Sequence, residues 1–588
     1  MIKAGWAAIT FLLIALPAQS QRNGNPAAGA PEAKPAPEEG IPVTDPLVIS
    51  KCGACHTRDA KGNMLRISWE RTTPEGWEEA IKRMVRLNGV DLTPTEARAI
   101  LKYLSTYHGL APEEAKPVMY FAEHRIQDET NIPNDSVRGA CANCHAFARA
   151  LSWRRSAEDW KLLTNFHVAF YATADQAFRR GLAAGGGGNA PPVPGPDNTP
   201  PVLPVDEALV FLGKSAPLHT PEWAAWRARM RAPKLAGRWL VTAHIPGKGN
   251  YYGELAIEPG ASPDEFITNL KLQSAKDGST VVRSGQGLVY AGYSWRGRSK
   301  GSATGSRAVD DLGVDDLKQE AREVLWFSPD ESQAEGRWFW GNYQEFGADV
   351  KLRRASADPT LIGTDRSALK VGSQTNRIRV IGDNLPAQVV SSDLDLGSGV
   401  QVRRIVSHNA SEIVAEVDVA ADAVPGKRDI TVGRSVLPSA IAVYDRIDYI
   451  QVVPESAIAR LGSDVHPKGY QQFEAVGYQR GADGKPHTAD DVELGPVDVN
   501  WSVEEFYSVY GDDDKDFVGT LGPTGLFTPA LDGPNPKRKF SRNNYGDIWV
   551  VATARNERDT SGKPLVGKSY LVVTVPLYVQ FDQPEVGQ

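Results

Sequence analysis

Cysteine is scarce in this sequence, and charge of one sign does not dominate it. Only four of the 588 residues are cysteine, and the formal net charge is −7 at pH 7. All four cysteines lie in two short motifs, which leaves none for a structural disulfide. No run of basic residues occurs, so a protein that binds nucleic acid is disfavoured.

Long hydrophobic runs are also lacking. An apolar stretch from Ala7 to Leu16 follows the positive charge of Lys3 and is followed by small residues. At about 10 residues it is too short to cross a bilayer about 30 Å thick, and its flanks are typical of a secretory signal. We therefore expect a signal peptide over residues 1–20 that is cleaved after Ser20, and a mature chain that is exported and has no membrane anchor.

The cysteines form two Cys-x-x-Cys-His motifs. In such a motif both thiols bond to the vinyl groups of a haem, and the adjacent histidine is an axial ligand of the iron. A redox Cys-x-x-Cys or half of a zinc site is the alternative for a single motif. A shared zinc ion would leave both histidines unused, and a thioredoxin-like site would need a βαβ context that these helical flanks lack. The sequence predicts two haem c groups, bound by Cys52 and Cys55 with His56, and by Cys141 and Cys144 with His145.

A repeated block follows each motif. Residues 67–71 (ISWER) correspond to residues 151–155 (LSWRR), and a second tryptophan, Trp77 or Trp160, follows each block. Met84 lies beyond Trp77 by the same interval as His167 lies beyond Trp160. That interval is about two helical turns, so each tryptophan shares a helix face with a possible iron ligand. We expect two tandem halves with the axial pairs His56–Met84 and His145–His167.

Other side chains compete for these distal positions. Met64 follows His56 too closely to reach the opposite face of the same haem, whereas His108, Met119 and His124 remain open alternatives. An isolated Met84 would more often be a core residue, and the repeat is what favours it as a ligand. Methionine ligation raises the reduction potential relative to two histidines, so unlike haems would form a potential step that favours electron flow in one direction.

The composition divides the chain into an all-α dihaem cytochrome c domain followed by all-β domains. Short alternating runs with turn residues between them predict antiparallel strands from about residue 234 onward, first in a barrel and then in two immunoglobulin-like sandwiches. We expect the following divisions: a flexible leader at 21–45; the dihaem domain at 46–232, with a Gly/Pro-rich insertion at 181–204; the β-barrel at 233–355; and the sandwiches at 356–445 and 446–588.

Three smaller features lie in the β-rich part. The stretch 309–327 (VDDLGVDDLKQEAREVLWF) predicts a short helix, and Trp501 is expected in the core of the last sandwich. Acidic clusters occur at 483–491 and at 512–514. They could offer oxygen ligands to calcium, but neither has EF-hand spacing, so solvated acidic loops are the favoured interpretation.

The layout resembles one family, the large α subunit of quinohaemoprotein amine dehydrogenase. The resemblance rests on the domain order together with residues 141–160 (CANCHAFARALSWRRSAEDW) and 216–223 (APLHTPEW). It implies a periplasmic complex that oxidises primary amines, with a cysteine tryptophylquinone on a small partner subunit beside a β-propeller subunit. Because every cysteine here is assigned to haem, this chain cannot form that quinone. It would pass electrons to an external acceptor such as a small copper protein or a cytochrome c.

Two other functions compete with this one. A dihaem peroxidase needs one iron with an open position, which two distal ligands and a long β-rich tail argue against. A generic periplasmic electron carrier, with its sandwiches as binding modules, is the non-catalytic alternative. Peroxide binding would favour the first, and the lack of a quinone-bearing partner would favour the second.

Overall fold

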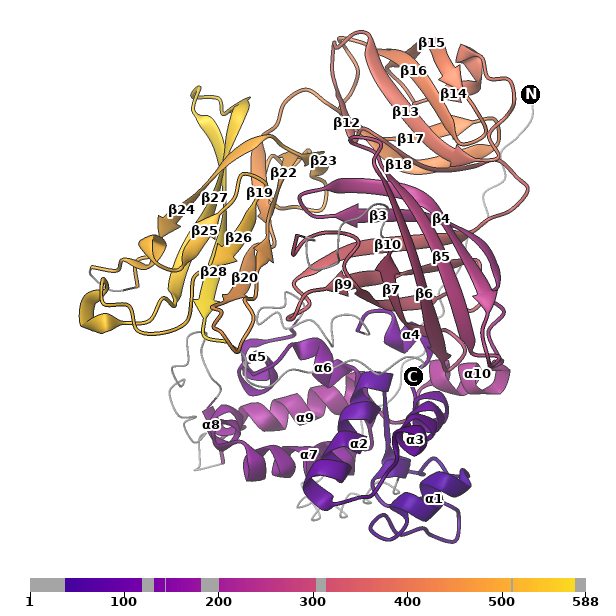
Figure 1. Cartoon of the computed structure of the whole chain (residues 1–588), viewed down its shortest axis with the longest axis vertical. Helices are drawn as coiled ribbons and strands as arrows, with labels where there is room; N and C mark the ends of the chain where they lie inside the picture. Colours follow the sequence, from indigo (N-terminus) through magenta and orange to yellow (C-terminus); the bar gives the residue numbers. More distant parts are fainter. Residues whose placement is uncertain are drawn as a thin grey trace, which may run out of the picture. The chain divides into compact units, whose positions relative to one another are not determined.

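The computed structural model describes residues 38–118, 132–142, 144–180, 200–302, 313–508 and 511–576. The predicted signal peptide, most of the leader and most of the Gly/Pro-rich insertion lie outside these residues. In the described part, helices occur before residue 230 and strands dominate after it (Figure 1). None of the described helices has the length and the apolar composition that crossing a membrane requires.

The helical part consists of two halves with similar order. Each half begins with a short helix that ends at the first cysteine of its motif, and each contains a longer helix that begins soon after a short strand. The first half contains α1 (Pro46–Cys52), η1 (Ile67–Trp69), β1 (Glu70–Thr72), α2 (Pro74–Asn88), α3 (Pro94–Tyr107) and α4 (Pro112–Ala115). The second contains α5 (Asp135–Cys141), α6 (Phe147–Leu151), β2 (Trp153–Arg155), α7 (Ala157–Phe170), α8 (Ala172–Arg180), α9 (Pro204–Ser215) and α10 (Pro221–Arg229).

The repeated blocks pair with each other. Strands β1 and β2 are antiparallel, with Glu70 opposite Arg155 and Thr72 opposite Trp153. The backbone N–H of Ser156 also donates to the Trp69 carbonyl at 3.2 Å. The two halves are therefore joined through equivalent segments, an arrangement that the sequence repeat by itself does not specify.

The last residues of the predicted flexible leader are packed into the first helical half. Ile41 and Val43 are buried, and their N–H groups donate to the carbonyls of Ser68 and Gly62. Apolar side chains that enter a core make a segment part of the domain, whatever its Pro and Ala content. The first half thus includes residues 41–45, where Asp45 caps α1.

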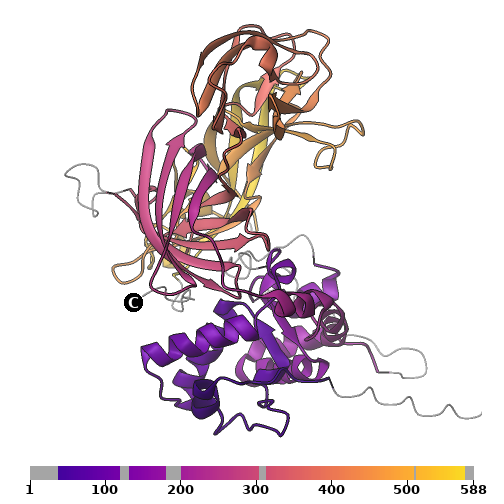
Figure 2. The same ribbon diagram turned by 90° about the vertical axis from the view of Figure 1, so that its right-hand side faces the viewer.

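The first eight strands after residue 236 form one closed antiparallel barrel. Neighbours in sequence are neighbours in the sheet, and β10 closes it by pairing with β3 (Figures 1 and 2). Burial alternates along the strands, most regularly along β5, as expected when one face points to the interior. The strands are β3 (Gly237–Ile245), β4 (Gly249–Pro259), β5 (Glu265–Ser274), β6 (Thr280–Tyr290), β7 (Ser294–Gly301), β8 (Ala321–Phe327), β9 (Gln333–Trp340) and β10 (Phe346–Arg354).

The short helix predicted over 309–327 is wrong for the described part of that stretch. Residues 313–320 form turns, and Ala321–Phe327 form strand β8. The run Val324–Phe327 is buried, with Leu325 and Phe327 in the barrel core and Val324 and Trp326 in another cluster. A strand buried on both faces has no period-two signal, so the sequence of this stretch does not distinguish a strand from a helix.

Two further groups of sheets complete the chain. The first is a pair of four-stranded sheets around one core, from β11 (Thr360–Thr364), β12 (Ala368–Lys370), β13 (Asn376–Asp383), η4 (Ser391–Asp393), β14 (Leu394–Asp395), β15 (Val400–His408), β16 (Glu412–Val419), β17 (Gly426–Val432) and β18 (Ser435–Tyr444). The second group, after residue 445, has a separate hydrophobic core, and Trp501 packs against this core as a partly buried residue.

The strands of that last part form one four-stranded and two three-stranded sheets. They are β19 (Tyr449–Val453), β20 (Ser456–Arg460), β21 (Gln471–Gln472), β22 (Glu474–Gln479), β23 (Val492–Pro496), β24 (Val499–Glu505), β25 (Gly519–Leu521), β26 (Leu526–Pro529), β27 (Gly546–Arg558) and β28 (Pro564–Thr574), with short 3-10 turns η5 (Asp514–Asp516) and η6 (Lys539–Ser541).

Candidate haem sites

Both attachment motifs begin at the end of a seven-residue helix. Asp45 caps α1 by accepting from the Val48 N–H at 2.9 Å, and Asn134 caps α5 by accepting from the Val137 N–H at 2.8 Å. Each helix ends at the first cysteine of its motif. In the first motif the chain then turns tightly, with the His56 N–H donating to the Cys52 carbonyl at 2.9 Å. The two motifs therefore have the same local support.

None of the four cysteines forms a disulfide. Burial raises the pKa of Cys52 and raises that of Cys141 to about 12. Among the residues that the structure describes, no group of three or more His, Cys, Asp and Glu side chains could hold a metal ion. This finding gives no support to a zinc site, and it is compatible with thiols that bond to a haem.

The histidine of each motif is oriented by a backbone carbonyl. The Nδ1–H of His56 donates to the Leu65 carbonyl at 2.8 Å, and that of His145 donates to the Ala146 carbonyl at 2.9 Å. Because a carbonyl oxygen only accepts, the proton must lie on Nδ1. The lone pair of Nε2 then remains for a metal, the arrangement usual for ligating histidines.

The two proposed distal ligands occupy equivalent places on equivalent helices. Thr73 caps α2 and Ser156 caps α7, so Met84 and His167 lie at the same position relative to their caps. The Nδ1–H of His167 donates to the Leu163 carbonyl at 2.9 Å, which also leaves its Nε2 free. The Met84 sulfur contacts the Asn88 amide at 3.7 Å. These geometries fit the donors that haem iron accepts.

The paired tryptophans fix these helices in the same way in both halves. Trp77 Nε1 donates to the carbonyl of His108 at 2.9 Å, and Trp160 Nε1 donates to that of Ala216 at 3.1 Å. Both acceptors follow the closing helix of their half, α3 or α9. Each indole is buried and therefore needs such a partner.

In the second half the two histidines lie close enough to interact. Burial lowers the pKa of His145 to about 4, and the charge of His167 is among the further causes. Burial also lowers the pKa of His167. Both rings are therefore neutral near pH 7, the state in which imidazole binds a metal.

Apolar side chains flank both distal positions. Val85 and Leu87 on α2 are 40% and 64% exposed, and Val168 and Phe170, at the equivalent positions on α7, are 42% and 61% exposed. A porphyrin is a large apolar plane, and a helix surface of this kind suits it. The residues present thus fit two haems, one in each half.

The competing ligands are less suitable or lie elsewhere. The side chain of Met64 is fully buried in the core around Trp77. His108 is also fully buried, and neither of its ring nitrogens has a hydrogen-bond partner in the described structure. Burial and the charges of Arg227 and Arg71 lower its pKa to about 3. His108 takes the place that Ala216 has in the second half, so the repeat gives it no ligand role. Met119 and His124 lie outside the described residues.

Sequence reasoning missed a group of charged residues between the halves. Arg149 of α6 forms an ion pair with Glu79 of α2, and the Arg83 guanidinium lies 5.6 Å from the centre of the Phe166 ring on α7. The charges of Arg83 and Arg149 help to lower the pKa of His167, after burial. These residues lie far apart in the sequence, so no local pattern could indicate that they meet.

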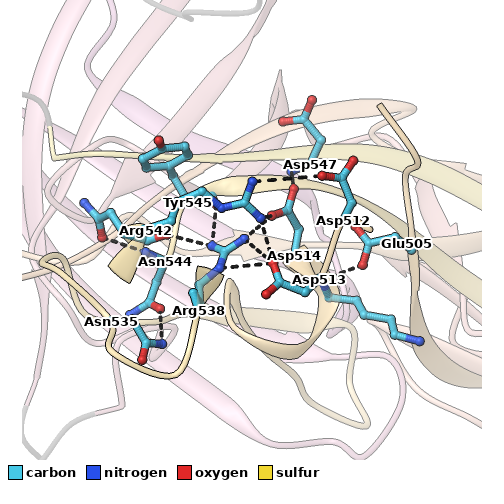
Figure 3. Close-up of polar contacts among 12 residues, drawn as sticks. Glu505, Asp512, Asp513, Asp514, Asn535, Arg538, Arg542, Asn544, Tyr545 and Asp547 are labelled. Carbon is cyan, nitrogen blue, oxygen red and sulfur yellow. Dashed lines mark hydrogen bonds and ion pairs between the residues drawn. The ribbon is translucent and has the colours of Figure 1, made fainter. Parts of the chain in front are cut away.

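The acidic clusters have partners that the sequence did not indicate. Asp513 and Asp514 are bound by Arg538 and Arg542, and Figure 3 shows both guanidinium groups directed at this segment. In the other cluster Asp491 accepts from the Tyr449 hydroxyl at 2.7 Å, and Thr488 donates to Asp490. Cationic partners or internal hydrogen bonds, rather than calcium ligands, account for these carboxylates.

Four family models match the chain, and all describe the α subunit of quinohemoprotein amine dehydrogenase. They are its haem-binding domain at residues 43–181, domain II at 232–355, domain III at 358–445 and domain IV at 450–586. No curated protein matches.

Among solved structures, a redesigned β-barrel is 14% identical, covers 21% of this chain and 92% of its own, and has a TM-score of 0.17. Human protocadherin-24 EC1-2 is 10% identical, covers 38% of this chain and 98% of its own, and has a TM-score of 0.15. Likenesses at this level carry no argument. The family models, with the helical haem-binding part and the barrel, show that this chain belongs to the quinohemoprotein amine dehydrogenase α-subunit family.

Proposed function

We propose that this chain is the dihaem electron-transfer subunit of a periplasmic amine dehydrogenase. It would take electrons from a cysteine tryptophylquinone on a small partner subunit, where primary amines are oxidised, and pass them to an external acceptor such as a small copper protein or a cytochrome c. A β-propeller subunit would complete the heterotrimer. Membership of the family and a haem-binding domain support the electron-transfer role.

One observation carries the proposal of two haems. The same support is built twice: a seven-residue helix ending at a cysteine, a histidine anchored through Nδ1, and a capped helix with a donor at the same position. A structural domain has no need to repeat these donors together with the buried tryptophans. The repetition supports two cofactors of one kind.

The residues of the chain would act by holding and tuning these groups. When bound, each haem supplies an iron that takes up and releases one electron at a time. Cys52, Cys55, Cys141 and Cys144 would hold the haems covalently, and the pairs His56–Met84 and His145–His167 would bind the irons. Methionine raises the reduction potential relative to a second histidine, so the first half would have the higher potential. Two one-electron sites match the two electrons released by an amine.

Anaerobic addition of a primary amine to the natively purified protein tests the function. The haem absorption bands should change to those of the reduced state, and prior addition of a hydrazine that traps the quinone should abolish the change. If haems that dithionite reduces fail to respond to amines in a preparation that contains every co-purifying subunit, the amine dehydrogenase function is wrong. The chain would then be an electron carrier for another donor.

A further inference from the structure

A single aromatic residue is displayed on a loop of the last domain. Phe540 is 91% exposed, the highest value among the exposed large hydrophobic residues of the described chain. Its φ is +62°, and that of the next residue, Ser541, is +51°. Bulky side chains rarely adopt this left-handed conformation, and such backbone persists only where surrounding structure imposes it. The loop therefore keeps the Phe540 side chain exposed in a backbone conformation that phenylalanine rarely adopts.

The surrounding structure is a buried network of charges. The Arg538 side chain is fully buried, and it donates to the carbonyls of Asn543 at 2.6 Å and Tyr545 at 2.9 Å. It also binds Asp513 at 2.8 Å and Asp514, while Arg542 binds the same two aspartates at 2.6 and 2.9 Å. Figure 3 shows the two arginines side by side against this acidic segment. The loop is thus fixed at both sides of Phe540.

The cations of the loop divide into two groups. Arg538 and Arg542 are neutralised by the aspartates, whereas Lys537 and Lys539 are exposed and form no ion pair within the part of the chain that the structure describes. The Lys539 ammonium lies 5.3 Å from the centre of the Phe540 ring. The tip of the loop is therefore an aromatic ring beside two free positive charges, in a chain whose net charge is −7.

We propose that the segment Pro536–Ser541 is a docking loop, in which Phe540 enters an apolar pocket with an acidic rim on another subunit of the amine dehydrogenase complex. Rigid aromatic anchors contribute most of the affinity at protein interfaces, because little side-chain freedom is lost when they bind. Flanking lysines would steer an acidic surface toward the loop. The identification of the partner as a subunit of this complex rests on the proposed function. The assignment of a docking loop rests on the exposure of Phe540, the backbone conformation and the charges of the loop.

A membrane surface fits these observations less well. An anionic bilayer would attract two lysines and one phenylalanine, but a fluid surface does not require a conformation imposed by a buried network. A protein pocket of fixed shape benefits from such a conformation, because a side chain that is already oriented loses less conformational freedom when it binds. The proposal therefore commits to a protein partner, and vesicle binding serves as a contradicting outcome.

The test measures assembly of the natively purified complex by sedimentation, comparing wild type with Phe540→Ala, Phe540→Gly and the pair Lys537→Glu/Lys539→Glu. Glycine adopts positive φ without strain, so Phe540→Gly removes the ring without weakening the fold. We expect the thermal midpoint of the free chain to stay at or above the wild-type value. We also expect the dissociation constant of the complex to rise at least tenfold. Val465→Ala, at a residue 80% exposed on the same domain, is the control and should leave assembly unchanged.

The charge variants and a cross-linker complete the test. Wild-type assembly should weaken as salt rises, and this dependence should shrink in the lysine variant. A photo-cross-linking residue at position 540 should become attached to one partner subunit. Assembly that is unaltered in Phe540→Ala and Phe540→Gly would overturn the docking loop while leaving the proposed function intact. Binding of the complex to phosphatidylglycerol vesicles that depends on Phe540 would also overturn it. A wild-type chain that assembles with no partner would instead contradict the proposed function.

Discussion

Arg296 of the barrel forms a buried double ion pair with Glu75 in the first turn of α2. The Nη2 of Arg296 lies 2.8 Å from one carboxylate oxygen of Glu75, and Nε contacts the other. Both side chains are almost fully buried, with 1% and 5% exposure. Because α2 also carries Trp77 and Met84, the barrel holds the start of the helix that would supply a distal ligand.

Replacing Arg296 with alanine should destabilise the protein strongly. It leaves the Glu75 carboxylate buried without its partner, which typically costs about 3–5 kcal/mol. Calorimetry of the purified chain should show a clear fall in the thermal midpoint. Arg296→Ala combined with Glu75→Ala should lose less than the sum of the single changes, because no lone charge remains. Strictly additive effects would contradict a direct coupling between these residues.

Met84→Ala should change one haem only. Loss of the thioether should remove the long-wavelength absorption band of a methionine-ligated ferric haem and lower one reduction potential. Potentiometric titration followed by absorption would resolve the two haems. Met64→Leu, at the fully buried methionine, is the matched control and should leave both potentials in place. If Met84→Ala keeps the band and both potentials, Met84 is not a ligand.

His167→Ala should convert the iron of the second half from low spin to high spin. The variant removes an imidazole whose Nδ1 is already committed to the Leu163 carbonyl and whose Nε2 is free. Electron paramagnetic resonance of the ferric protein measures the change. His108→Ala is the comparison, since His108 is buried and its equivalent in the second half is Ala216, which has no side chain that could bind iron. A spin change in His108→Ala, with none in His167→Ala, would reverse the assignment.

The sequence is most informative where the residues of a candidate site form a local pattern that occurs twice. The two Cys-x-x-Cys-His motifs and the interval from Trp77 to Met84 and from Trp160 to His167 are visible because each lies within one or two helices. The structure places both donors at the same position after a cap, as that interval implied. The axial assignments themselves stay predictions.

Contacts between distant segments could not be predicted. Nothing in the order of residues pairs Glu75 with Arg296, or places two arginines against Asp513 and Asp514, because the partners lie on separate elements. The helix predicted before Phe327 is wrong for a related reason: a strand buried on both faces shows no alternation. A sequence pattern indicates the type of a single element and which of its faces is exposed. The ion pairs and the doubly buried strand depend instead on which elements pack together.

His244 of β3 should make the stability of the chain depend on pH. Its Nε2 lies 2.8 Å from a Glu474 oxygen on β22, and its Nδ1 lies 2.8 Å from the Asn250 side-chain oxygen. Both neighbours can only accept at these atoms, so the geometry suits the doubly protonated ring. Burial opposes the charge, but Glu474 outweighs it and raises the pKa of His244 to about 9.

A pKa that is higher in the folded than in the unfolded chain stabilises the fold at low pH. The contribution should be complete below the unfolded value of about 6.5 and should be lost as pH rises through about 9. Since the His244 side chain is 37% exposed, screening should limit the effect to about 1 kcal/mol. Thermal midpoints measured across this range should fall more in wild type than in His244→Gln, whose amide keeps a hydrogen bond but does not titrate. If the thermal midpoints of the two proteins change in parallel with pH, His244 is not charged in this contact, because every other titrating group is common to both proteins.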